Sequence, residues 1–229
     1  MNMNVQKTIL AATTLALVAA CGGGGGGGAG GPVASTNTFN VQSGYQRLAS
    51  AGWNKTFNVT GSCTGTLTIT AAPATTATTF EGSSALSGNE VSSFSWAGCT
   101  PASGSSTIVR YFDSNHLPLG YSESGDYGVY VSTPNIPSAA KVNDVVIVGT
   151  INKYTSSAKT TPNGREDVTL VMEADTATTA IANMIYKTYD SSGTLTLTEQ
   201  DRFRVAADGS LVPISLDVQF STGARVFGH

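Results

Sequence analysis

Two carboxylates near a predicted β-turn are the residues whose types and spacing could support catalysis. Asp208 and Gly209 suit a two-residue type I′ hairpin turn, because that turn needs positive φ at both central positions. With this turn, strict alternation places Glu199 and Asp201 on one otherwise apolar face, with Asp201 opposite Leu216. Two carboxyl groups can act as acid and base in the hydrolysis of a glycoside. The pair is therefore our candidate for a catalytic site.

Two non-catalytic arrangements explain the same spacing, and we favour them. A β-bulge near Gln200 would reverse the alternation, so that Glu199 and Asp201 would both point to water. A widened barrel end open to solvent would hydrate the two acids where they stand. Either arrangement avoids the cost of burying unpaired carboxylates, which would also raise their pKa values. The sequence thus favours a protein that is not an enzyme.

Other catalytic and metal-binding motifs are incomplete. The chain holds only two histidines, His116 and His229, so a Ser-His-Asp triad has few ways to form. Residues 120–124 start like the G-x-S-x-G turn of hydrolases, but Ser124 stands where the second glycine belongs. Residues 113–115 begin like a calcium loop, without the glycine and the bidentate glutamate at the required spacing. We expect neither a metal nor another cofactor.

A loose group of tyrosines is the second candidate site, here for ligand binding. A tyrosine offers a flat apolar area and a polar tip, which suits contacts with sugars and peptides. Cross-strand packing is the alternative explanation for such a group. The residues are Tyr111, Tyr121, Tyr127 and Tyr130.

The composition excludes several classes of protein. The net charge of −3 at pH 7 is too small and of the wrong sign for a nucleic-acid-binding protein, which needs clustered Lys and Arg. With 40% hydrophobic and 12% charged residues, the chain is not a charge-driven disordered protein. Its 31 Thr and 25 Ser among 229 residues, together with few Lys and Glu, disfavour a helical bundle and favour strands.

The apolar pattern predicts an all-β fold. In the second half of the chain apolar residues recur with a period close to two, and turn-forming segments separate the runs. Asn163-Gly164 suits a tight hairpin turn, and Asp190–Gly193 suits a slightly longer loop. Long strands joined in sequence order by short loops make an antiparallel meander, which we expect to form a β-sandwich or a (half-)barrel. The segment 57–70 is predicted as a strand pair or one long bent strand. The other predicted strands are 79–96, 107–112, 127–132, 145–151, 167–175, 180–189, 194–205 and 211–220, with one short helical turn at 44–50.

The first residues resemble the export signal of a bacterial lipoprotein. Lys7 precedes an apolar run that is too short to span a bilayer, which favours a signal peptide over residues 1–20. The run ends in Val18-Ala19-Ala20-Cys21, which resembles the lipobox of that family, although Leu is more usual than Val at its first position. The resemblance implies that Cys21 carries the lipid anchor. An ordinary secretory signal with an incidental cysteine is the alternative.

The segment after Cys21 predicts a location and a tether. Gly22 stands where an Asp would resemble an inner-membrane retention signal, so the resemblance implies the outer membrane of a Gram-negative envelope. Residues 21–37 are rich in glycine and free of charge, which is typical of a flexible linker. We expect one β domain over 38–229. Two lobes that divide near 133–141 are the alternative, because two prolines interrupt sheet pairing there.

Two cysteines remain once Cys21 is assigned to the anchor. Export would place Cys63 and Cys99 in an oxidising compartment, so we predict a disulfide between them. Two buried free thiols are the alternative, and two cysteines are too few for a closed zinc site.

These observations support three functions. The main expectation is an outer-membrane lipoprotein without enzymatic activity, a binding or structural module that its lipid holds to the membrane. The first alternative is a periplasmic carrier whose β half-barrel holds a lipid or another apolar ligand in its cavity. The second alternative is an envelope hydrolase that uses Glu199 and Asp201. The lining expected for the carrier cavity is Ile185, Leu195, Leu197, Ile214 and Leu216.

Overall fold

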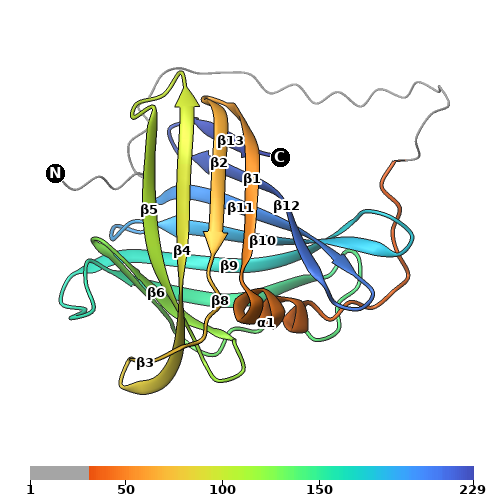
Figure 1. Ribbon diagram of the computed structural model, residues 1–229, viewed down its shortest axis with the longest axis horizontal. Coiled ribbons are helices and arrows are strands. Elements are labelled where there is room, and N and C mark those ends of the chain that lie inside the picture. Colours follow the sequence, from red (N-terminus) through yellow and green to blue (C-terminus); the bar gives the residue numbers. More distant parts are fainter. Residues whose placement is uncertain (1–30) are drawn as a thin grey trace.

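The computed structural model describes residues 31–229, and all but one of their regular elements are β-strands (Figure 1). The all-β class expected from the sequence is confirmed. The expected signal peptide, the lipidated Cys21 and most of the glycine tether lie outside the described residues. The elements are α1 (Val41–Ala51), β1 (Trp53–Gly61), β2 (Thr64–Ala71), β3 (Thr76–Phe80), β4 (Ser83–Ala97), β5 (Ser103–Phe112), β6 (Pro118–Glu123), β7 (Asp126–Tyr130), β8 (Val145–Tyr154), β9 (Pro162–Ala174), β10 (Thr179–Tyr189), β11 (Leu195–Ala206), β12 (Leu211–Phe220) and β13 (Arg225–Gly228).

The strands form one closed antiparallel ring. Twelve strands follow one another around it, largely in sequence order, and the pairing of β2 with β4 closes it. β1 lies between β2 and β13, which joins the two ends of the chain's strand order. β3 continues along the same edge of β4 that β2 occupies, so it adds no position to the ring. The predicted meander is therefore present as a twelve-stranded barrel.

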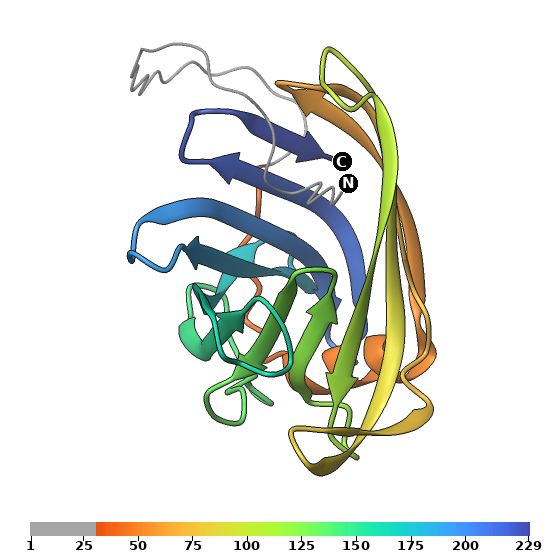
Figure 2. The same ribbon diagram turned by 90° about the vertical axis from the view of Figure 1, so that its left-hand side faces the viewer.

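Two walls of this barrel cross at a steep angle. β1, β2, β4 and β5 run along one side, and β8–β12 run across them on the other (Figures 1 and 2). In orthogonally packed sheets, strands pass from one layer to the other through bends and bulges. Register shifts of this kind occur where β5 pairs with β6, β8 with β9, β10 with β11 and β11 with β12. The interior of the barrel is the space between the two walls.

Three of the hairpins share a three-residue loop that ends in glycine. Gly193, Gly209 and Gly223 have φ values of 84°, 78° and 88°, a region that other residues enter only at a cost. In each loop the glycine N–H donates to the carbonyl oxygen three residues earlier. This is the geometry of a type I turn followed by a left-handed residue. The longer loop predicted at Asp190–Gly193 is confirmed.

Two predicted two-residue turns are wrong. Asp208-Gly209 belongs to one of the three-residue loops just described. Asn163 and Gly164 lie inside β9, and the β8–β9 loop spans 155–161 instead. A Cβ at Gly164 would overlap the carbonyl oxygen of Tyr189 on β10. Here glycine permits a close approach of two strands rather than a turn.

The main core lies between α1 and the inner face of β8–β12. α1 is capped by Asn40, whose Oδ1 accepts a hydrogen bond from the Ser43 N–H at 2.9 Å. The short helical turn predicted at 44–50 is therefore an 11-residue helix. Gly44 lets this helix lie against the β11–β12 loop, because a Cβ there would overlap the Gly209 carbonyl oxygen. The largest buried side chains of this core include Phe39, Val41, Leu170, Met172, Met184 and Val205.

Two segments outside the strands complete the domain. Val33, in the segment expected to be tether, donates its N–H to the Asp175 carbonyl oxygen at 3.1 Å. The proline-containing stretch 133–141 connects β7 to β8, which are neighbours in the ring. Both partners of every strand pairing lie within 33–229, so this part of the chain contains the complete barrel. Among residues 31–229, no helix is long and apolar enough to cross a membrane.

The outer face of the β1–β2–β4–β5 wall is covered with hydroxyl groups. Thr56 and Thr68 on neighbouring strands share a hydrogen bond at 2.8 Å between their Oγ1 atoms. Thr68 pairs with Ser93, and Ser93 pairs with Ser105, so the row continues across four strands. The inward positions between them carry apolar side chains such as Leu67. Much of the Ser and Thr of this sequence is thus used as the water-facing half of an alternating pattern.

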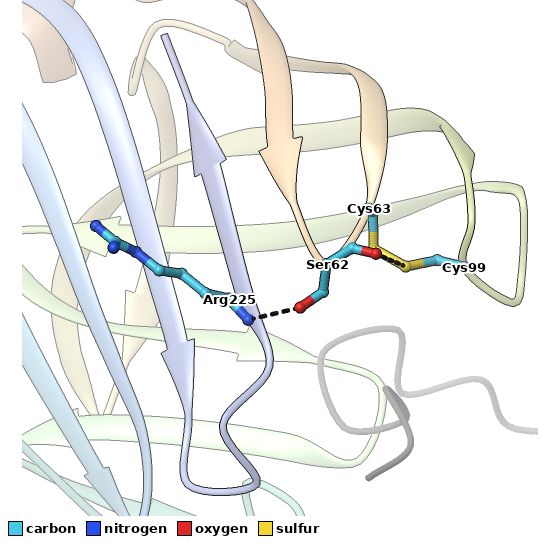
Figure 3. The surroundings of a disulfide bond; sticks show 4 residues. All are labelled: Ser62, Cys63, Cys99 and Arg225. Atoms are coloured by element: carbon cyan, nitrogen blue, oxygen red, sulfur yellow. Dashed lines mark hydrogen bonds between the residues drawn. A yellow bond between two sulfur atoms is a disulfide. The ribbon is translucent and has the colours of Figure 1, made fainter. Parts of the chain in front are cut away.

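A disulfide connects two hairpins at the end of the barrel opposite α1. Cys63 lies between β1 and β2, and Cys99 lies between β4 and β5, with 5.5 Å between their Cα atoms. The predicted disulfide is confirmed. Figure 3 shows that the same corner includes β13, where the Arg225 N–H donates to Ser62 Oγ at 3.0 Å. Covalent and hydrogen bonds therefore meet where β1 joins β2 and β13.

Removal of the disulfide is expected to destabilise the barrel without abolishing it. The bond closes a loop with a sequence separation of 36 residues. Loss of that restraint in the unfolded chain corresponds to about 3–4 kcal/mol. Urea unfolding of Cys63→Ser/Cys99→Ser should show a decrease of this size in the free energy of unfolding. The reduced wild-type protein is the matched control and should match the double variant. Equal stability of the variant and the oxidised protein would contradict the prediction.

Candidate functional site

A cavity of about 650 Å³ runs through the barrel. The side chains of an eight-stranded barrel can fill its interior, whereas twelve strands enclose a wider space. Exposed residues border the cavity at both ends, Ala72 near α1 and Ser221 and Thr222 in the β12–β13 loop. Its volume is in the range of small-molecule binding sites. The cavity is therefore the candidate functional site.

Glu199 and Asp201 both line this cavity from β11. Glu199 pairs with Val218 on β12, and Asp201 pairs with Leu216, as strict alternation predicts. Their neighbours on the other side, on β10, are Tyr186 and Met184. The two acids therefore stand on the inner face, between apolar and aromatic side chains.

The expectation that a bulge turns the two acids to water is wrong. A register shift does occur in the β11–β12 pairing, but it lies between Arg202 and Phe203 rather than near Gln200. The three-residue loop shifts the register by one, so that Phe203 pairs with Pro213, and the bulge on β12 restores it before Asp201. The register is thus restored between the loop and the two acids, and both acids keep their inward orientation.

The surroundings of the two acids favour their protonated forms. Burial raises the pKa of Glu199 to about 7, and the charge of Glu166 adds to this rise. Burial, followed by the charge of Glu199, raises the pKa of Asp201 well above its usual range. Near neutral pH the pair therefore carries less charge than two exposed carboxylates would.

The cavity wall contains one arginine and one lysine, and each is paired with a carboxylate. On the β4–β5 wall, Arg110 donates to Glu90 through Nε at 2.8 Å and Nη2 at 2.6 Å. Burial alone would lower the pKa of Arg110, but the charge and hydrogen bonds of Glu90 raise it overall. The Lys153 ammonium lies 3.0 Å from Asp126, and its side chain is only 7% exposed. Both cations are therefore already neutralised.

Acids outnumber these cations in the cavity wall. Besides the two paired acids and the Glu199–Asp201 pair, Glu166 faces the interior and accepts a hydrogen bond from Thr188 Oγ1 at 2.8 Å. The described lining thus has an excess of carboxylates. Its acids are Glu90, Glu123, Asp126, Glu166, Asp190, Glu199 and Asp201, and its Arg and Lys residues are Arg110 and Lys153.

The predicted tyrosine group divides between two places. Tyr121 and Tyr130 pack against the main core and line the cavity, and Tyr121 Oη donates to Asp126 at 3.1 Å. Tyr111 and Tyr127 instead pack on Phe80, with ring centroids 4.4 and 5.5 Å from it. This second cluster supports the β3–β4 hairpin by cross-strand packing. Tyr111 lines the cavity as well, so the structure brings three of the four tyrosines, all but Tyr127, to the candidate site.

The apolar lining differs in part from the one expected for a carrier. Leu197 and Leu216 line the cavity. Ile185 pairs with Gln200 on the outer face, because it lies one position from the inward Tyr186. Leu195 is 38% exposed at the start of β11, and Ile214 occupies the bulge on β12. Further apolar lining comes from the opposite wall and includes Ile69, Phe94, Trp96 and Ile108.

Sequence reasoning missed several polar residues of the cavity. Glu90 and Arg110 lie on β4 and β5, across the barrel from β11, and Glu166 lies on β9, two strands away from it, so no local motif connects them. A local signal did exist for Arg110, since it lies two positions from both Ile108 and Phe112 in a predicted strand and so shares their face. A charge at such an inward position indicates an interior that is not a dry core.

Comparison of the chain with protein-family models, with curated proteins and with solved structures finds no match. The chemistry of the site must therefore be judged from its own residues. Among residues 31–229 no group of three or more His, Cys, Asp or Glu side chains is placed to hold a metal ion. What the cavity offers is space, aromatic and aliphatic surface, and carboxylates without cationic partners.

Glu199→Gln is expected to stabilise the protein at high pH and to have little effect at low pH. Between the usual pKa of a glutamate and about 7, the folded protein holds a proton that the unfolded chain releases. Stability due to this group is therefore lost as the pH rises through that window. Removal of the charge should raise the free energy of unfolding by about 2 kcal/mol at pH 8, and by much less at pH 4.

Urea titrations at the two pH values measure this difference. Glu173→Gln is the control, because Glu173 on the outer face accepts from Arg202 Nε at 3.1 Å. Its loss should leave stability at pH 8 unchanged or lower it. A Glu199→Gln variant that is less stable than wild type at pH 8 would show that the carboxylate is ionised and satisfied in the folded protein.

Proposed function

We propose that this protein is a lipid-anchored binding protein of the bacterial envelope that holds a small organic molecule inside its barrel. The observation that carries the proposal is the cavity of about 650 Å³. Exposed residues border this cavity, and its lining includes both polar and apolar side chains. A large pocket with a few convergent polar groups is the usual form of a ligand site. This function is closest to the carrier that the sequence suggested as an alternative.

The polar lining argues against a purely structural role for the barrel. Protein interiors are close-packed, and a carboxylate without a cation is costly to keep inside one. A scaffold with no ligand gains nothing from Glu166, Glu199 and Asp201 at inward positions. A binding protein does gain from them, because a few polar groups orient its ligand.

The arrangement of the acids supports binding over glycoside hydrolysis. A hydrolase needs two carboxyl groups about 5 Å or more apart, so that the scissile bond fits between them. Glu199 and Asp201 instead project from adjacent inward positions of one strand, so both carboxyl groups stand on the same wall of the cavity. Such a pair presents one combined polar surface to a ligand on a single side.

The location in this proposal rests on the residues before the barrel. Residues 1–20 have the pattern of an export signal, and Cys21 ends a sequence that resembles a lipobox. The disulfide Cys63–Cys99 is what an oxidising compartment would favour. Gly22 in place of Asp supports the outer membrane rather than the inner one.

The ligand should remain with the barrel during mild purification. Residues 31–229, exported to a bacterial periplasm and purified without detergent, should give a native mass spectrum with an added small-molecule mass. Val218→Trp fills the cavity wall beside Glu199 and should remove the adduct. Val212→Trp is the matched control, because Val212 lies on the same strand and is 57% exposed. Adducts of equal abundance on both variants would contradict binding inside the barrel.

The anchor is tested separately. Cys21→Ser should abolish incorporation of labelled palmitate. It should also move the protein from the membrane fraction to the soluble fraction, since stable anchoring requires the acyl chains. Metabolic labelling followed by membrane fractionation measures both effects. Cys63→Ser is a suitable control, and it should keep the label. Labelled protein in the Cys21→Ser variant would place the lipid elsewhere.

A further inference from the structure

The charge of the cavity indicates the chemical class of its ligand. Arg110 and Lys153 are each held by their own carboxylate partner, as described above. No further Lys or Arg stands in the described lining to offset Glu166, Glu199 and Asp201. A ligand that brings a positive charge would favour the ionised forms of these acids and pair with them, whereas an anion would be repelled by whatever charge they carry.

The surroundings of the acids favour an organic cation with an apolar part. On β12 the inward neighbours of Glu199 and Asp201 are Val218 and Leu216, which belong to an apolar cluster with Phe94. On β10 the neighbour of Glu199 is Tyr186. A tyrosine ring face attracts a cation that has lost part of its water. The acids are thus bordered by an aromatic ring on one strand and by aliphatic surface on the next.

A buried hydroxyl at the same site has no protein partner. Tyr45, on α1, lines the cavity, and its buried Oη atom makes no hydrogen bond within the described part of the chain. Its ring packs on Phe203, two residues after Asp201 on the same inward face, with 5.6 Å between ring centroids. A buried polar atom without a partner is costly, and a phenol oxygen can accept from an ammonium group.

We propose that the cavity binds an amphiphilic amine, with its ammonium group against Glu199 and Asp201 and its apolar part against Leu216 and Val218. The inference rests on the proposed ligand-binding function and adds the charge of the ligand to it. In this arrangement the ammonium N–H groups donate to the two carboxylates and to Tyr45 Oη. The apolar part replaces cavity water along β12.

Three ten-carbon probes test the sign of the charge. Decylammonium, decanol and decanoate have the same chain and differ in the head group. Each is used to displace the neutral fluorophore N-phenyl-1-naphthylamine from residues 31–229, with calorimetry as a second measurement. Decylammonium should bind at least tenfold more tightly than decanol, and decanoate should bind most weakly. In Glu199→Gln/Asp201→Asn the preference for the cation should fall to twofold or less, with decanol affinity retained.

A matched variant controls for total charge. Glu173→Gln/Asp175→Asn also removes one Glu and one Asp two positions apart, but on the outer face, where they pair with Arg202 and Arg204. It should keep the tenfold preference. Decanol or decanoate bound as tightly as decylammonium would overturn the inference and leave the binding function standing. Failure of the fluorophore and of all three probes to bind would overturn the binding function as well.

Discussion

The closure of twelve strands into one ring is the constraint on which the interior of this protein depends. Closure pairs the backbone of every ring position and removes the sheet edges that would otherwise be exposed. The same closure fixes a width that inward side chains do not fill. Many inward positions therefore border a cavity in addition to packing on one another. This is why polar residues such as Glu199 can stand at positions that alternation assigns to the core.

The polar interior is organised as pairs on facing walls. Arg110 lies on β5, six strands from β11 in the ring of twelve, so it faces Glu199 and Asp201 across the cavity. Its bidentate contact with Glu90 on the neighbouring strand fixes its position and uses its charge. The Arg110 side chain is 42% exposed, so this partly buried ion pair contributes little net stability. It leaves one wall electrically balanced and the other with an excess of acid.

Local patterns predicted the parts of this fold that local interactions determine. The five long strands from β8 to β12 were found because alternation is a property of one segment, and the same rule placed Glu199 and Asp201 on the inner face. The bulge beside Phe203 was misplaced, because it compensates for a loop whose length was misjudged by one residue. β6 and β13 were missed, since strands this short show no period. Glu90 on β4 reaches the site only through closure of the ring, which no local pattern reveals.

The pairing of β1 with β13 has a consequence for the order of events in the cell. Thr60 Oγ1 donates to the Phe227 carbonyl oxygen across a sequence separation of 167 residues. Contacts so distant along the chain form late, because the entropy of closing the loop must be overcome first. The ring cannot close until β13 is available. During the export proposed above, the extended chain would therefore contain little stable structure, and the barrel would assemble only after nearly all of it had crossed the membrane.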